Sequence, residues 1–370
     1  MLISLKESVA NRVTEALKKY IVKNNPSVEE LFVNLGDIKT VRVLSFYSGY
    51  ASIVKRELSL SLTSPVSCPD ATIWIWRETG MADFIPRVLG INSSEFESDG
   101  TKWHEIYYRG SDGDMRGMAS IDTEGDCGVH CSFGNEYFYG LDGLGPSNWF
   151  KEGHAMFQSF FHILNQPSYS FVHGACVGLE GTGVLMCARG GGGKSTLSVQ
   201  AMLKGFDYVS DDYLILREEG DGLSASPIYS FITLSPEMYE RMYDDLDRAR
   251  FLGVSPWKGK YIFDISAYAD RFNRNYPVKA LLFPEINPDA TVPEVTKCSQ
   301  SEKGKTVVQI AHSTVSQMGF NGFRGGQKDK VFILKTIKML SGLDCYKITL
   351  CPDILGNVDC LKDLTLSLKR

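Results

Sequence analysis

The chain has 370 residues, of which 43% are hydrophobic and 22% are charged, a balance typical of globular proteins with room for one large or two ordinary domains. The formal net charge of −5 gives no basic footprint for nucleic acid. No segment reaches the ~18 uninterrupted apolar residues of a membrane helix, and the first seven residues carry charge, unlike a signal peptide. We therefore expect a cytoplasmic protein with no nucleic-acid partner and no membrane partner.

The first half of the chain is predicted to be a β-rich α+β region over residues 1–165. A helix is expected at 5–23, with apolar residues at helical spacing, and a second, shorter helix should start at Ser27-Val28-Glu29-Glu30. Short β-branched and aromatic runs then predict strands at 41–47, 72–76, 104–108, 115–121 and 136–139. The segment Gly143–Asn148 is the clearest break, and a helix is expected behind it at 149–164.

The second half, residues 166–370, alternates between strands and helices and predicts an α/β nucleotide-binding domain. Strands are expected at 171–177, 184–188, 206–209, 213–216, 261–265, 278–283 and 346–350. Helices are expected at 195–204, 327–340 and 353–368. A further helix should start at Ser235-Pro236 and run to about Leu252, because serine is a good N-cap and proline suits the first helical position.

The nine cysteines are scattered along the chain. Cys176, Cys187 and Cys345 lie in apolar runs, where a thiol behaves as a small apolar side chain. The cluster Cys127-Gly128-Val129-His130-Cys131 holds three soft ligands, but no second pair follows at the spacing of a zinc site. A structural role is therefore favoured over metal binding.

Residues 188–196 read Ala-Arg-Gly-Gly-Gly-Gly-Lys-Ser-Thr and follow a buried strand. A loop around a polyphosphate turns its N–H groups inward, and glycines can adopt the positive φ angles that this needs. ATP or another NTP is thus the expected ligand. Its binding residues are predicted to be Arg189, Gly190, Gly191, Gly192, Gly193, Lys194, Ser195 and Thr196.

Within this loop, Lys194 would face the β- and γ-phosphates and Ser195 would offer a hydroxyl to Mg²⁺. The helix that starts there points the positive end of its dipole at the phosphates. Ala188 stands where the usual pattern has its first glycine, which a β-region φ tolerates. The alternative is a glycine-rich turn followed by a lysine.

Asp211 and Asp212 follow a short strand behind the loop helix, where Mg²⁺ and an acceptor hydroxyl could meet. Adjacent side chains on an extended segment point to opposite faces. One carboxylate is therefore assigned to the acceptor and the other to the metal or its waters, with a solvated Asp-Asp turn as the alternative.

Three segments surround these motifs. They are Val172-His173-Gly174-Ala175-Cys176-Val177, Gly181-Thr182-Gly183-Val184-Leu185 and Val209-Ser210-Asp211-Asp212. His173 stands 21 residues before Lys194, and Asp211 stands 17 residues after it. Together with the loop, residues 170–212 resemble the catalytic domain of HPr kinase/phosphorylase and its P-loop relatives.

The resemblance implies a fold akin to phosphoenolpyruvate carboxykinase, an oligomer of the chain, and transfer of a γ-phosphoryl group to a serine-type hydroxyl. By match of motif, Asp211 would be the catalytic base, Asp212 would support the metal with Ser195, and His173 would lie near the phosphates. The acceptor would be a hydroxyl of a peptide, small protein or metabolite. The family's second, Arg-Gly-Leu-Gly-type signature is missing from residues 248–253, so HPr itself and the reverse phosphorylase reaction are not expected.

Phosphoryl transfer needs positive charge in addition to Lys194. Candidates for it are Arg189, Lys258, Lys260, Arg271 and Arg274, and Asn321–Gly326 is a candidate closing loop. Other functions remain open: a nucleotide-binding regulatory or scaffold module, a carboxykinase-like lyase, or simple NTP hydrolysis.

Overall fold

The computed structural model describes residues 2–78, 105–109, 115–116, 118–121, 128–133, 135–142, 154–164, 168–188, 190–220, 222–246, 249–254, 259–317 and 327–369. The chain divides into two compact units. Unit 1 comprises residues 1–34, 39–56 and 62–159, and unit 2 comprises 35–38, 57–61 and 160–370. The sequence predicts a division into two functional domains between residues 165 and 166. That division concerns function, not compactness, and stays a prediction.

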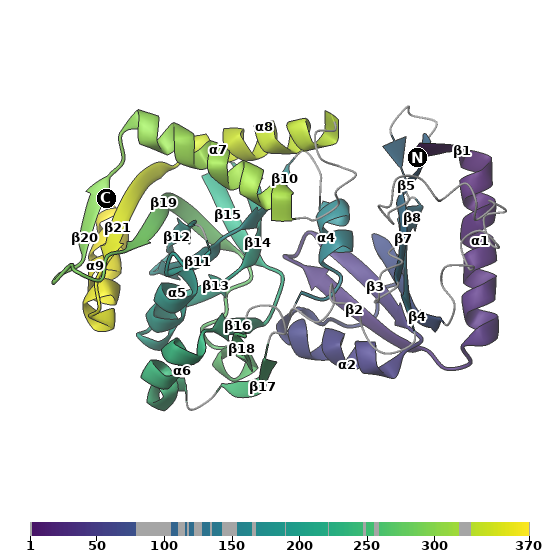
Figure 1. Ribbon diagram of the computed structural model, residues 1–370, viewed down its shortest axis with the longest axis horizontal. Coiled ribbons are helices and arrows are strands. Elements are labelled where there is room, and N and C mark those ends of the chain that lie inside the picture. Colours follow the sequence, from purple (N-terminus) through teal and green to yellow (C-terminus); the bar gives the residue numbers. More distant parts are fainter. Residues whose placement is uncertain are drawn as a thin grey trace. The chain divides into compact units, whose positions relative to one another are not determined.

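Unit 1 contains a six-stranded sheet of order β2-β3-β4-β9-β8-β7 and, within the described residues, a second sheet of order β1-β5-β6 (Figure 1). The strands are β1 (Leu2–Lys6), β2 (Glu29–Leu35), β3 (Lys39–Ser45), β4 (Ala71–Glu78), β5 (Glu105–Arg109), β6 (Met115–Arg116), β7 (Met118–Ile121), β8 (Gly128–Phe133) and β9 (Glu136–Asp142). The helices are α1 (Glu7–Asn24) and α2 (Ser48–Glu57). This agrees with the expected β-rich character of the first half.

The start of β2 corrects one sequence prediction. The short helix expected to start at residues 27–30 is wrong, because Glu29 already begins a strand beside β3. Phe32 and Val33 of that strand are buried, as β-branched and aromatic side chains favour. Near the middle of the sheet, the Trp74 ring stacks between Phe46 and Phe138, with centroids 6.0 Å apart on each side.

Unit 2 is built on a nine-stranded mixed sheet whose main path is β10-β14-β15-β19-β12-β11-β13, with β21 beside β19 and β20 beside β21. Its strands are β10 (Tyr169–His173), β11 (Ala175–Leu179), β12 (Thr182–Met186), β13 (Asp207–Ser210), β14 (Tyr213–Glu219), β15 (Gly222–Pro227), β19 (Tyr276–Ile286), β20 (Glu294–Lys297) and β21 (Asp344–Leu350). A three-stranded sheet of order β16-β18-β17 consists of β16 (Phe231–Leu234), β17 (Arg250–Val254) and β18 (Tyr261–Asp264). The helices are α5 (Lys194–Leu203), α6 (Pro236–Met242), α7 (Gln300–Gln317), α8 (Gln327–Ser341) and α9 (Ile354–Ser367), while α4 (Phe157–Leu164) spans the division between the units.

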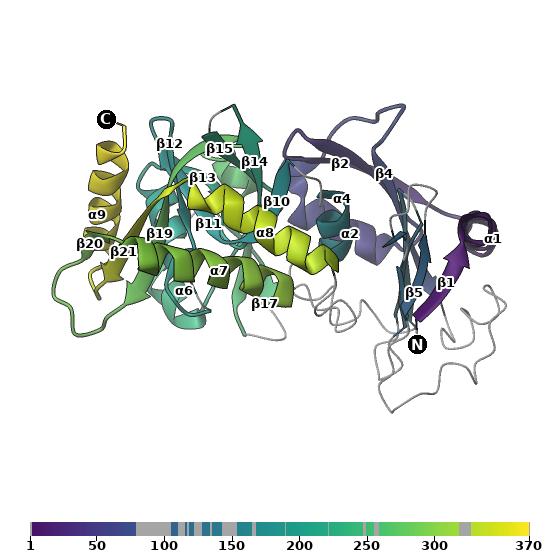
Figure 2. The ribbon, with the colours of Figure 1, turned by 90° about the horizontal axis from the view of Figure 1, so that it is seen from above.

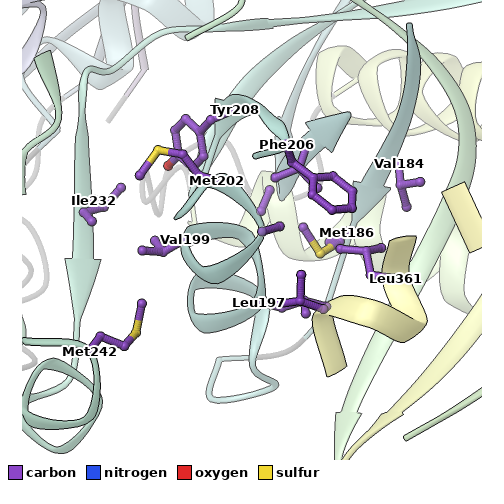
Figure 3. Packing of buried hydrophobic residues seen from close by; sticks show 14 of the residues in the cluster. Val184, Met186, Leu197, Val199, Met202, Phe206, Tyr208, Ile232, Met242 and Leu361 are labelled. Carbon is purple, nitrogen blue, oxygen red and sulfur yellow. The ribbon is translucent and has the colours of Figure 1, made fainter. Parts of the chain in front are cut away.

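Alternating residues of the central strands divide the core of unit 2 into two layers. Val184 and Met186 of β12 pack with α5 and α9 (Figure 3), whereas the intervening Leu185 packs with α7 and α8. Figures 1 and 2 show α7 and α8 lying side by side. Because strand side chains alternate between faces, a continuous apolar run such as β12 is buried on both. Unit 2 is therefore a mixed α/β assembly with helices on both faces of its sheet.

The segment after Ser235 also differs from its prediction. Ser235 does cap α6, since its side chain accepts a hydrogen bond from the Met238 N–H at 3.3 Å. The helix, however, ends at Met242 and does not reach Leu252, which lies in β17. Pairing of β17 with β18 outweighs the local helical preference of this stretch.

Candidate active site

The glycine loop, residues 188–193, joins the buried strand β12 to helix α5. Gly191 and Gly193 have φ angles of 82° and 88°, which side chains with a Cβ rarely adopt. A Cβ on Gly193 would also lie only 2.5 Å from Leu350 Cδ1. Ala188 is not among the described residues with positive φ, in line with the β-region φ expected for it. The glycines at 191 and 193 are thus required by the backbone path.

Helix α5 begins at Lys194 without a side-chain cap. Its N-cap is Gly193, and no side-chain hydrogen bond is made there. The first N–H groups of any α-helix have no acceptor within the helix, so those of α5 can receive an anion. The Lys194 side chain is only 7% exposed, and its Nζ donates to the Ala188 carbonyl at 2.9 Å. The ammonium group is therefore held across the loop.

Asp211 lies directly after β13 and contacts the first turns of α5. Its carboxylate is 4% exposed and accepts from the Ser198 hydroxyl and the Thr233 N–H, each at 3.4 Å. The Ser195 side chain lies near the same carboxylate and lowers its pKa. Burial, followed by the negative charge of Asp212, raises the pKa of Asp211, and the nearby Ser195 hydroxyl partly opposes this.

Asp212 has a different partner. His173, at the end of β10, places Nε2 2.6 Å from Asp212 Oδ1. The Gly174 N–H donates to the Asp212 carbonyl at 2.8 Å, and the Tyr213 ring lies 5.1 Å from the imidazole, centroid to centroid. The backbone N–H of His173 donates to the Thr314 hydroxyl of α7 at 3.3 Å. The adjacent carboxylates thus reach different groups.

The structure brings together most of the residues singled out in the sequence. Lys194, Ser195 and Asp211 meet at the start of α5, and His173 reaches Asp212. Gly190, Gly192 and Thr196 lie in the same loop and first turn, while Arg189 is outside the described residues. Their roles toward a ligand stay predictions.

Two further contacts of Asp211 were missed in the sequence. Ser198 follows Ser195 by one helical turn, and this spacing could have indicated it. Thr233 belongs to β16 and lies 22 residues beyond Asp211, so no local signal could have found it.

The basic residues that were candidates for additional positive charge at the site lie in different places. The positive charge of Lys260 lowers the pKa of Asp211 against the stronger effect of burial, so this lysine lies within electrostatic reach of that carboxylate. Arg271 donates to the Gly205 carbonyl at 3.1 Å and Arg274 to the Leu60 carbonyl at 2.6 Å, contacts that stabilise the fold. Lys258 and the loop Asn321–Gly326 lie outside the described residues.

Among the described residues, no three His, Cys, Asp or Glu side chains gather closely enough to hold a metal ion. Cys127 of the cysteine–histidine cluster lies outside them. The oxygen donors at the start of α5, a hydroxyl and a carboxylate, are of the kind that Mg²⁺ prefers when phosphate and water complete its shell.

No described helix has the length and apolarity needed to cross a membrane.

No protein-family model and no curated protein matches this chain. Among solved structures, it is similar to the HPr(Ser) kinase/phosphatase from Coxiella burnetii, with 13% sequence identity and a TM-score of 0.29. The match covers 54% of this chain and 99% of that one. A likeness of this strength carries no argument about activity, which has to come from the site itself.

Proposed function

We propose that the protein is an NTP-dependent kinase that transfers the γ-phosphoryl group to a hydroxyl of a peptide, small protein or small molecule. The observation that carries the proposal is the position of the buried Asp211 carboxylate against the first turns of the uncapped helix α5, where it accepts a hydrogen bond from the Ser198 hydroxyl at 3.4 Å. It joins a phosphate-binding element to a group able to accept a proton.

The phosphates would be bound by the backbone of the glycine loop and by Lys194. The free N–H groups at the start of α5 and the helix dipole both favour an anion there. Lys194 Nζ now donates to the uncharged Ala188 carbonyl, and a phosphate oxygen would be a stronger acceptor for this ammonium group. Binding therefore needs only a local exchange of acceptors at Nζ.

Mg²⁺ fits the oxygen donors of the site. A bound magnesium ion would neutralise charge on the β- and γ-phosphates during transfer. Ser195 would offer its hydroxyl, as in the sequence prediction, and Asp212 or Asp211 would hold the waters of the ion. Ser195 would then turn from Asp211 toward the ion, which would leave that carboxylate more basic.

Asp211 is proposed as the general base. Burial and the charge of Asp212 raise its pKa, and a carboxylate with a raised pKa takes a proton more readily from a hydroxyl. Asp212, which is more exposed and lies beside His173, would hold the acceptor or the metal. The reverse assignment, with Asp212 as the base, is tested by the same pair of variants.

The test is transfer of labelled γ-phosphate from MgATP and MgGTP to a panel of peptides and metabolites. We expect Asp211→Asn to lower transfer at least ~100-fold, because general-base catalysis contributes that much or more, with nucleotide affinity largely unchanged. Asp353→Asn is the matched control, since asparagine caps a helix as well as aspartate does. If Asp211→Asn transfers normally while Asp212→Asn does not, the two roles are reversed. Tight nucleotide binding without transfer to any acceptor would favour the regulatory or scaffold module.

A further inference from the structure

The strand order around the glycine loop indicates on which side each end of a bound nucleotide would lie. The loop follows β12, whose neighbours are β11 and β19, and β13 lies beyond β11. Asp211 follows β13, so the acceptor end of the triphosphate would lie toward that side. The nucleoside end should then lie toward β19 and β21, which run parallel to β12 and present their carboxyl ends at the same edge.

Ile286, the last residue of β19, provides an apolar surface at this edge. Its side chain is 55% exposed, whereas Leu350, its aligned partner at the end of β21, is buried. Both side chains border the loop, because a Cβ on Gly193 would lie 2.5 Å from Leu350 Cδ1 and 3.4 Å from Ile286 Cγ1. Val292, on the segment between β19 and β20, is 69% exposed as well.

We propose that the exposed face of Ile286 is the surface on which the base of the donor nucleotide rests. The inference rests on the proposed function, since it names a subsite of the same donor. A nucleobase has a flat apolar face, and covering it with an aliphatic side chain removes apolar surface of both from water. Ligands of open α/β sheets bind beyond the carboxyl ends of the strands, which is where Ile286 lies.

The experiment compares two ligands that share phosphates but differ in the base. Calorimetric titrations with MgATP and with magnesium tripolyphosphate are run on the wild-type protein, Ile286→Ser, Lys194→Ala and Val308→Ser. Val308 is a partly exposed aliphatic residue on α7 and serves as the matched control. Circular dichroism melts verify that each variant is folded.

We expect Ile286→Ser to bind MgATP about fivefold more weakly, the scale of losing part of one apolar contact, with tripolyphosphate binding unchanged. Lys194→Ala should weaken both ligands, and Val308→Ser neither. Equal affinities of MgATP for the wild type and Ile286→Ser, or equal losses for both ligands, would overturn the subsite while leaving the phosphate loop in place. A wild-type protein that binds neither ligand would instead overturn the proposed function.

Discussion

Helices α5 and α9 pack against each other in the same layer but begin in opposite ways. At α9 the Asp353 carboxylate accepts from the Gly356 N–H at 3.1 Å. At α5 the N-cap is Gly193 in a left-handed conformation, and no side chain caps the helix. The cap of α9 is supplied by the chain, as is usual where a helix end serves only the fold. The first N–H groups of α5 have no such side-chain acceptor. These N–H groups are the physical basis for an anion site at the start of α5.

Removal of the charge at the start of α5 should have the largest effect on nucleotide binding. Lys194→Ala deletes the only ammonium group seen to reach into the described part of the loop. A charged hydrogen bond is worth roughly 1.5–3 kcal/mol, so MgATP affinity should fall about 10- to 100-fold. Fluorescent-nucleotide titration measures it, and unchanged affinity would show that the phosphates bind elsewhere.

Gly193→Ala tests whether the start of α5 depends on its backbone path. An L side chain at φ 88° is strained, by about 1–2 kcal/mol, and its Cβ would displace Leu350. We expect a lower free energy of unfolding in urea and at least tenfold weaker MgATP binding. Gly304→Ala in α7, where a Cβ meets nothing within 4 Å, is the control. It should leave MgATP binding unchanged and raise the free energy of unfolding by about 0.5–1 kcal/mol, because alanine favours a helix interior more than glycine does. Full nucleotide binding by Gly193→Ala would mean that the loop geometry is not needed.

Asp353→Ala removes the cap from the other helix. Loss of an N-cap costs about 1 kcal/mol, so the variant should unfold at lower urea concentration, while MgATP affinity should stay the same. Asp353→Asn should restore stability. If Asp353→Ala weakened nucleotide binding as much as stability, the two helix ends would not be separable in function.

The smallest expected effect is a gain in stability from Asp211→Asn. The pKa of Asp211 is raised above its ordinary value of 3.8 by burial, so its ionised form is disfavoured in the fold and costs stability as pH rises through that pKa. The neutral amide avoids this cost. The Tm of the variant should exceed that of the wild type at pH 7, and the difference should shrink as pH is lowered toward 3.8. A lower Tm at pH 7 would mean that the carboxylate stabilises the site.

Local signals were enough for part of the fold. The strand before the loop, helix α5, the cap at Ser235 and the start of α9 all follow from short-range rules on glycine, capping and apolar runs. Helix α7 was not predicted, although Ser299 and Glu302 form a capping box, which is a sequence signal for a helix N-terminus. The end of α6 could not be found locally, because β17 exists only through its pairing with β18.

The site residues also divide into those that local sequence signals identify and those whose contacts depend on strand pairing. The loop residues are adjacent in the sequence, so Lys194 and Ser195 could be assigned from the motif alone. His173 ends β10 and Asp212 directly precedes β14, so their contact depends on how β10 and β14 pair. Asp212 was assigned from its place after a strand behind the loop helix and His173 from a resemblance to a family, whereas the contact between them was not predicted. Thr233 had no such spacing and was missed.

The capping box at the start of α7 should respond to acid differently from Asp211. Hydrogen bonds from the Ser299 hydroxyl and N–H, together with Lys347 of β21, lower the pKa of Glu302 to about 2. Asp211 has the opposite shift, so protons reach it at a higher pH than they reach Glu302. A fall in pH therefore neutralises the proposed base while the junction between α7 and β21 remains charged. Acid inactivation should therefore occur at a higher pH than loss of the ion pair between Glu302 and Lys347, with activity returning on neutralisation.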